Sequence, residues 1–139
     1  MKKANLLFLL LFIAVFSINA QPITTTSPNQ DDKNAPIITF EKFVHDYGTI
    51  TEGANGVCEF KFKNTGKSPL ILTKPQSSCG CTIPDWPQEP ILPGKTSVIK
   101  VTYDTKKIGV INKEVTVYSN SKDGSIKLSI KGNVLKSTP

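Results

Sequence analysis

Apolar and polar residues alternate with a period of two along most of the chain after Pro36. The alternation is clearest in residues 57–64, where cysteine and phenylalanine alternate with glutamate and lysine. It returns in residues 99–103, 115–118 and 126–131, and no window has apolar residues at helical spacing over three turns. A period of two places successive side chains on opposite faces of a half-buried strand. The pattern therefore predicts an all-β domain.

Turn-forming residues separate these runs at intervals that suit short strands. The Asn-Thr-Gly sequence at 64–66 is expected to form a turn in which Gly66 adopts a positive φ. Residues 120–125 contain Asp-Gly and are expected to close a hairpin, and an earlier strand is expected in residues 37–43. The spacing predicts an immunoglobulin-like antiparallel β-sandwich of about seven strands over residues 36–135. A small barrel shares these signals, but the size and the strand count favour the sandwich.

Residues 79–93 depart from this rhythm because they contain four prolines and the one tryptophan of the chain. Proline lacks the backbone donor of a sheet ladder, so this segment is expected to be a long irregular crossing between the two sheets. For the same reason Pro75 is expected to end the short strand in residues 70–73. Trp86 has two interpretations: a cap over the open end of the core, or an exposed ring on which a ligand stacks.

The N-terminal residues have the pattern of an export signal. Two lysines near the start precede an apolar run at 6–16 that is too short to span a membrane, and Ala20 stands at the expected cleavage point. We expect a signal peptide in residues 1–20, a flexible Thr/Pro-rich linker in 21–35 and a short C-terminal tail in 136–139. These features predict an exported protein, in the periplasm or the extracellular medium, with no membrane span in the mature chain.

The chain carries a formal net charge of +6, and all 17 basic residues are lysines. Arginine forms the bidentate contacts with phosphate and guanine, so its absence argues against a nucleic-acid partner. The lysines alternate with apolar residues in the expected strands, where positive charge on the outer face favours solubility and protects sheet edges.

The patterns of common enzyme sites are missing from the sequence. Gly94-Lys95-Thr96 resembles the end of a phosphate-binding loop, but the upstream glycine that this loop requires is missing. No Gly-x-Ser-x-Gly elbow is present, and a cysteine–histidine pair would have to use His45 without an identifiable third partner. We therefore expect no catalytic residue and no cofactor.

The three cysteines offer one disulfide in three alternative pairings, each of which leaves one thiol free. A bridge between Cys79 and Cys81 requires the chain to curl at Gly80, which glycine permits. Cys58 shares a strand face with two phenylalanines, so it is expected to be a buried thiol unless it reaches the crossing and pairs with one of the other two. Two further alternatives are reduced, inert thiols and a soft-metal site that also uses His45. Neither replaces the disulfide as the prediction, so no metal ligand is assigned.

Several short motifs together resemble a bacterial family known as domain of unknown function 1573. They cover about residues 40–134, nearly the whole expected domain. The motifs are Asp46-Tyr47-Gly48-Thr49-Ile50, Phe60-Lys61-Phe62-Lys63-Asn64-Thr65-Gly66, Pro69-Leu70-Ile71-Leu72, Ser78-Cys79-Gly80-Cys81-Thr82, Pro93-Gly94, Ser119-Asn120 and Ile130-Lys131-Gly132-Asn133-Val134. The resemblance implies a small exported immunoglobulin-like sandwich, similar to the Hydin-like and major-sperm-protein-like domains that act as assembly and binding modules. It implies no activity, cofactor or catalytic residue.

These observations predict an exported, non-catalytic binding or structural module with an unknown ligand and a protein or cell-envelope partner. Recognition is expected at a sheet edge or at the crossing around Trp86, with the cysteines holding the crossing in place. The alternative is a thiol-dependent redox or copper-handling protein that uses Cys79 and Cys81.

Overall fold

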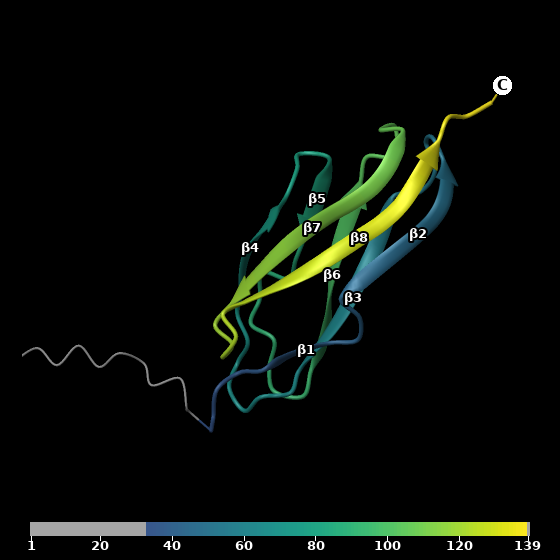
Figure 1. Ribbon diagram of the computed structural model, residues 1–139. Helices are drawn as coiled ribbons and strands as arrows, with labels where there is room; N and C mark the ends of the chain where they lie inside the picture. The colour runs from purple at the N-terminus through teal and green to yellow at the C-terminus, as the bar shows by residue number, and fades with distance from the viewer. Residues whose placement is uncertain (1–32, 139) are drawn as a thin grey trace, which may run out of the picture.

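Two four-stranded β-sheets pack face to face in the computed structural model, which describes residues 33–138 (Figure 1). The strands in chain order are β1 (Ile38–Phe40), β2 (Val44–Thr51), β3 (Val57–Asn64), β4 (Leu72–Ser77), β5 (Thr82–Asp85), β6 (Thr96–Tyr103), β7 (Gly109–Ser119) and β8 (Ser125–Leu135). One sheet has the order β1-β3-β6-β5, and the other has the order β2-β8-β7-β4. The all-β sandwich that the alternation predicts is confirmed. No helix among residues 33–138 has the length and the apolar character that crossing a membrane requires.

Inward-facing residues of both sheets form one hydrophobic core. Phe60 and Phe62 of β3 are fully buried and belong to the same cluster as Leu128 and Ile130 of β8. The residues that alternate with them in β3, a glutamate and two lysines, are exposed. Burying each large apolar side chain contributes roughly 1.5–3 kcal/mol, so the alternation stabilises the sandwich and also determines which face of each strand points inward.

The strand β2 does not follow from the alternation, because none of its residues is fully buried. β2 pairs in parallel with β8, whereas the other neighbouring pairs among the described strands are antiparallel. The sequence predicts an antiparallel sandwich of about seven strands. The described residues form eight strands, with one parallel pair. The alternation predicts which face is buried and carries no signal for the direction of the partner strand.

Two prolines lie within strands, which corrects the expected boundaries near the crossing. Pro75 does not end β4; it lies where the pairing of β4 with β7 shifts register between Thr73 and Gln76. Pro84 lies in β5, inside the segment that was expected to be irregular. β4 and β5 are each the last strand of their sheet. The open edge of a sheet tolerates a residue without a backbone donor, which explains both positions.

The turn after β3 depends on Gly66 for a reason different from the expected one. The φ of Gly66 is not positive, so that prediction is wrong. A Cβ atom at this position would instead overlap the backbone of Ala35 and Ile37. The backbone carbonyl of Ala35 also accepts a hydrogen bond from the Lys67 amide at 3.3 Å. Glycine therefore allows the chain before β1 to pass directly against this turn.

The two ends of the domain are described to different extents. The predicted signal peptide (1–20) and most of the predicted linker (21–35) lie outside the described residues. At the other end, the predicted hairpin at 120–125 joins β7 to β8, and β8 ends at Leu135. The last strand leads the chain away from the sandwich at the upper right of Figure 1.

Candidate functional site

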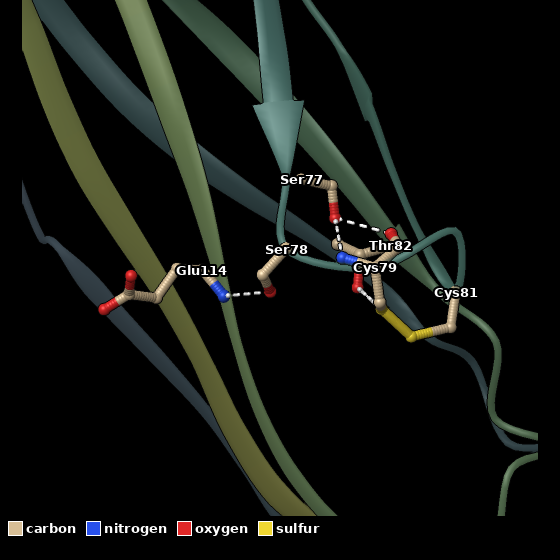
Figure 2. Close-up of a disulfide and its surroundings, with 6 residues drawn as sticks. All are labelled: Ser77, Ser78, Cys79, Cys81, Thr82 and Glu114. Carbon is tan, nitrogen blue, oxygen red and sulfur yellow. Dashed lines mark hydrogen bonds between the residues drawn. A yellow bond between two sulfur atoms is a disulfide. The ribbon is translucent and has the colours of Figure 1, made fainter.

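The short turn that joins β4 to β5 contains a disulfide between Cys79 and Cys81 (Figure 2). Their Cα atoms are 5.3 Å apart, which is shorter than the ~6.6 Å expected for residues i and i+2 of an extended chain. The curl is a hydrogen-bonded turn, in which the Thr82 amide donates to the Cys79 carbonyl at 3.3 Å. Of the three pairings left open by the sequence, the structure contains this one.

The disulfide turn is hydrogen-bonded to both sheets. On one side, the Ser78 amide donates to the Glu114 carbonyl in β7 at 2.9 Å. The Glu114 amide donates in turn to Ser78 Oγ at 3.1 Å (Figure 2). On the other side, the Asp104 amide, just after β6, donates to the Cys81 carbonyl at 2.9 Å. The turn therefore bridges the two layers of the sandwich through backbone groups and the Ser78 hydroxyl, and none of these bonds involves sulfur.

Two hydroxyl groups lie close to the sulfur atoms or the turn backbone. Ser77 Oγ donates to the Cys79 carbonyl at 2.8 Å and accepts from the Cys79 amide at 3.3 Å. Thr82 Oγ1 lies 3.5 Å from Cys79 Sγ and 4.0 Å from Cys81 Sγ. Cys81 is buried, with 9% of its surface exposed, whereas Cys79 is only partly buried. Cys79 is therefore the more exposed of the two cysteines.

Gly80 does not supply the special conformation that the sequence suggested. Its φ is not positive, and a Cβ atom built at this position would meet open space. The chain does curl at Gly80, as the bridge requires, but neither its φ nor the space around it excludes a residue other than glycine.

Cys58 is separated from this pair by a strand. It lies on β3, whereas Cys81 directly precedes β5, and β6 runs between these two strands. Two strand spacings amount to about 10 Å, which exceeds the reach of a disulfide. Cys58 is a free thiol with 4% of its surface exposed, and burial raises its pKa. Burial also raises the pKa of Tyr47, which lies beside Cys58 and donates a hydrogen bond from its hydroxyl to the Gly56 carbonyl at 2.7 Å.

His45 lies too far across the sheet to join the disulfide cysteines. It belongs to β2, at the edge of its sheet opposite β4, and stacks edge-on against Tyr47 with ring centroids 4.5 Å apart. Desolvation lowers its pKa, and the positive charge of Lys42 lowers it further. Within residues 33–138, no three His, Cys, Asp or Glu side chains are grouped so that they could hold a metal ion. The residues proposed for a soft-metal site are therefore not brought together.

A groove runs between the edge strands β4 and β5, with the disulfide turn at one end. We call it the β4–β5 groove, and it has a volume of about 580 Å³. It is lined by Lys74, Pro75, Gln76, Ser77, Cys79, Gly80, Thr82, Ile83 and Pro84. Ile83 is the most exposed large apolar residue on it, with 66% of its surface accessible. The sequence did not predict this groove, because the expected irregular crossing left no strand opposite β4.

A second depression lies on the other side of the same turn. We call it the lysine hollow; its volume is about 460 Å³, and Cys79, Gly80, Cys81, Tyr103, Asp104, Lys107 and Lys113 line it. Lys113 is partly buried and lies opposite the buried Ile130 in the β7–β8 ladder, with the buried Ile111 and Val115 two positions away on either side. It therefore occupies a core-facing position of β7. The alternation at 111, 113, 115 and 117 contained this signal, since one of four inward positions holds a charged residue.

Trp86 follows β5 directly. Its side chain is partly buried and packs against the core cluster. It does not belong to the residues that line the β4–β5 groove or the lysine hollow. This position fits the capping interpretation better than a stacking platform.

Several solved structures share this fold at low sequence identity. A protein of unknown function from Porphyromonas gingivalis W83 aligns with a TM-score of 0.64 and 14% identity, over 73% of this chain and 48% of that chain. The ASH/PapD-like domain 7 of human CEP192 aligns with a TM-score of 0.59 and 8% identity, over 76% of this chain and 89% of that one. The CupB2 chaperone of Pseudomonas aeruginosa aligns with a TM-score of 0.51 and 6% identity, over 69% and 55%. At these identities the similarity shows the fold alone.

The chain spans about half of the length of the Porphyromonas gingivalis protein whose structure it matches. Comparison by sequence identifies a family. No curated protein matches this chain. A family model described as "Protein of unknown function (DUF1573)" matches residues 38–134, which extends from β1 to β8. The resemblance carried by the sequence motifs is thereby confirmed, and the chain belongs to this family of unknown function.

Proposed function

We propose that this protein is an exported, non-catalytic binding module that holds an extended segment of a protein partner in the β4–β5 groove. The observation that carries the proposal is the groove itself: two edge strands from opposite sheets flank one open groove with both polar and apolar lining residues. A single extended polypeptide strand can lie along such a groove and place alternate side chains against it. No catalytic step is part of the proposal.

The prolines on the edge strands define the kind of recognition. Pro75 in β4 and Pro84 in β5 each remove a backbone donor from the edge that faces the groove. A long uninterrupted ladder with a partner strand is therefore blocked on both sides, which also protects the edges against aggregation. Binding must then depend on apolar contacts with Ile83 and on a few main-chain hydrogen bonds, so specificity would come from the side chains of the partner.

Two observations support export. The N-terminal residues 1–20 have the pattern of a secretory signal peptide. The Cys79–Cys81 disulfide is a type of bond that persists in oxidising compartments and is rare in the cytosol. Together they favour the periplasm or the extracellular medium as the place of action. Mass determination of the N-terminus of protein secreted from its own cells tests this part directly.

The binding surface is testable with a library of random short peptides displayed on phage and selected against the purified protein. The Ile83→Asp variant should weaken binding of the selected peptides by at least about tenfold, because it places a charge in the groove. Val110→Asp is the matched control: Val110 is 78% exposed, lies on β7 and does not line the groove. Its affinity for the same peptides should stay unchanged.

Two results would contradict the proposal. The library could yield no peptide that binds the folded protein, or the selected peptides could bind Ile83→Asp as tightly as the unmodified protein. Loss of binding in Val110→Asp alone would place the binding surface on β7 instead of in the groove.

A further inference from the structure

We propose that the Cys79–Cys81 disulfide is a thiol–disulfide exchange site, which low-molecular-weight or protein thiols open by attack on Cys79. The proposal goes beyond the binding function and does not depend on it. Three features of the turn carry it: the size of the ring, the accessibility of Cys79 and the position of Lys113.

The ring that the disulfide closes is very small, since the two cysteines are two positions apart in the sequence. A crosslink between neighbouring residues restricts the unfolded chain much less than one that closes a long loop. By linkage, folding makes a disulfide harder to reduce only to the extent that the disulfide stabilises the folded protein. The turn also keeps its hydrogen bonds to Glu114 and Asp104 when the sulfur atoms separate. Reduction is therefore opposed only weakly by the fold.

The two sulfur atoms differ in access. Cys79 is partly exposed and lines both the β4–β5 groove and the lysine hollow, whereas Cys81 is buried and lines only the hollow. An incoming thiolate can thus approach Cys79 from the groove, with Cys81 as the leaving group on the inner side. The hydroxyl of Thr82, 3.5 Å from Cys79 Sγ, can donate a hydrogen bond to a thiolate formed there.

The charges around the leaving group favour its release as a thiolate. Lys113, which faces the core side of β7, lines the hollow beside both cysteines, as does Lys107. Among the described residues, the side chain of Lys113 makes no hydrogen bond or ion pair. The one carboxylate in the hollow, Asp104, accepts a hydrogen bond from the Lys106 amide at 3.1 Å, and Figure 2 shows the Glu114 carboxylate directed away from the disulfide. A nearby ammonium group stabilises a thiolate, and a better leaving thiolate makes exchange faster.

The reaction proceeds in two exchanges. The thiolate of a first thiol molecule bonds to Cys79 Sγ, the bond between Cys79 and Cys81 breaks, and its electron pair leaves with Cys81 as a thiolate. A second thiol then attacks the thiol-derived sulfur of the mixed disulfide and releases Cys79. Two thiols are oxidised to one disulfide, while the protein disulfide is reduced to two thiols that take up protons from water. With a substrate dithiol in place of the two thiols, the same sequence passes the disulfide from the protein to the substrate, and the reverse sequence restores the protein disulfide by reducing an external disulfide.

The test uses oxidised purified protein, reduced glutathione as the thiol and rapid trapping with N-ethylmaleimide, followed by peptide mass spectrometry. We expect opening by glutathione in the folded protein, with the trapped mixed disulfide on Cys79. Lys113→Met should slow opening by about fivefold and raise the pKa of the released thiol, followed by thiolate absorbance. Lys113→Arg, which keeps the charge, should react at nearly the original rate, and Lys61→Met on the outer face of β3 should have no effect.

Several results would overturn the proposal. These are a disulfide that glutathione cannot open until the protein unfolds, a mixed disulfide that forms on Cys81, or equal rates for the unmodified protein and Lys113→Met. Lys113→Met is expected to fold, because an apolar residue suits a core-facing position of β7. Circular dichroism checks that its sheets remain.

Discussion

Reduction of the Cys79–Cys81 disulfide should leave the sandwich folded, with only a small loss of stability. In the chain-entropy model a crosslink acts by restricting the unfolded chain, and its effect grows with the logarithm of the loop length. The two cysteines are two positions apart, and a ring of this size gives about 1.6 kcal/mol at 25 °C. A ring from Cys58 to Cys79 would give about 3.4 kcal/mol in the same model. The observed pairing therefore predicts the smaller value.

The folded state offers no large additional loss on reduction. The hydrogen bonds that hold the turn to Glu114 and Asp104 use backbone groups and the Ser78 hydroxyl, and none requires the sulfur–sulfur bond. Both Cys79 and Cys81 remain as thiols of nearly the same volume, so no cavity opens in the core. The estimate of about 1.6 kcal/mol is therefore close to an upper limit.

The assay is urea unfolding of the oxidised and reduced protein, followed by the fluorescence of Trp86, the one tryptophan of the chain. Trp86 packs against the core cluster, so its emission reports on unfolding. The midpoint should fall by the amount that corresponds to no more than about 1.6 kcal/mol, and the slope should stay the same.

The control for this assay is Cys58→Ala, which keeps the disulfide and should show the same difference between the oxidised and reduced forms. A loss above about 3 kcal/mol on reduction would refute the reasoning, because it exceeds what so small a ring gives. A difference that disappears in Cys58→Ala would refute it as well, because the bridge would then involve Cys58.

Three further predictions concern stability. Gly66→Ala should destabilise the protein by more than about 2 kcal/mol, because the added Cβ overlaps backbone atoms. Gly80→Ala should cost less than about 0.5 kcal/mol, because its Cβ meets open space. Equal urea midpoints for the two variants would contradict this prediction. Asn64→Ala should cost about 2–3 kcal/mol in the same assay, because the buried amide donates to the Ser68 and Ile91 carbonyls, each at 2.8 Å, and a neutral substitution would show that these bonds do not matter. Stability should fall as the pH drops below 6.5, because folding lowers the pKa of His45 from that value and the unfolded chain therefore binds the proton first. Urea midpoints measured across this range should fall less in His45→Gln. Identical pH dependence in both proteins would show that His45 does not contribute to it.

Much of the fold could be predicted because the period-two alternation directly reflects burial on one side of a sheet. β3, β6, β8 and the later part of β7 each bury alternate residues, and their positions follow from the sequence. β2 could not be predicted, because none of its residues is fully buried; it pairs with β8, and only Tyr47 and Ile50 pack against the core cluster. The prolines in β4 and β5 led to wrong strand boundaries for a related reason. Proline is tolerated in edge strands and excluded from central strands, and the sequence does not show which strands lie at an edge.

The candidate site was predictable only in part. The motif around Cys79 and Cys81 marked the right turn, and the compartment suggested by the N-terminus favoured a disulfide. The two depressions beside it are formed by residues far apart in the chain. β4 and β5 flank the groove, while Lys107 from the loop before β7 and Lys113 from β7 line the hollow. Such juxtapositions depend on the order of strands in each sheet, which the alternation does not determine. Lys113 alone carried a readable signal, as a charged residue among inward positions.

Amide chemical-shift mapping by NMR, with a peptide selected from the random library added to isotopically labelled protein, tests the central claim most directly. The account predicts shifts concentrated in β4 and β5, at Gln76, Ser77, Thr82 and Ile83, with the rest of the sandwich unchanged. Shifts confined to β2 or to the outer face of β7 and β8, with none along the β4–β5 groove, would contradict it.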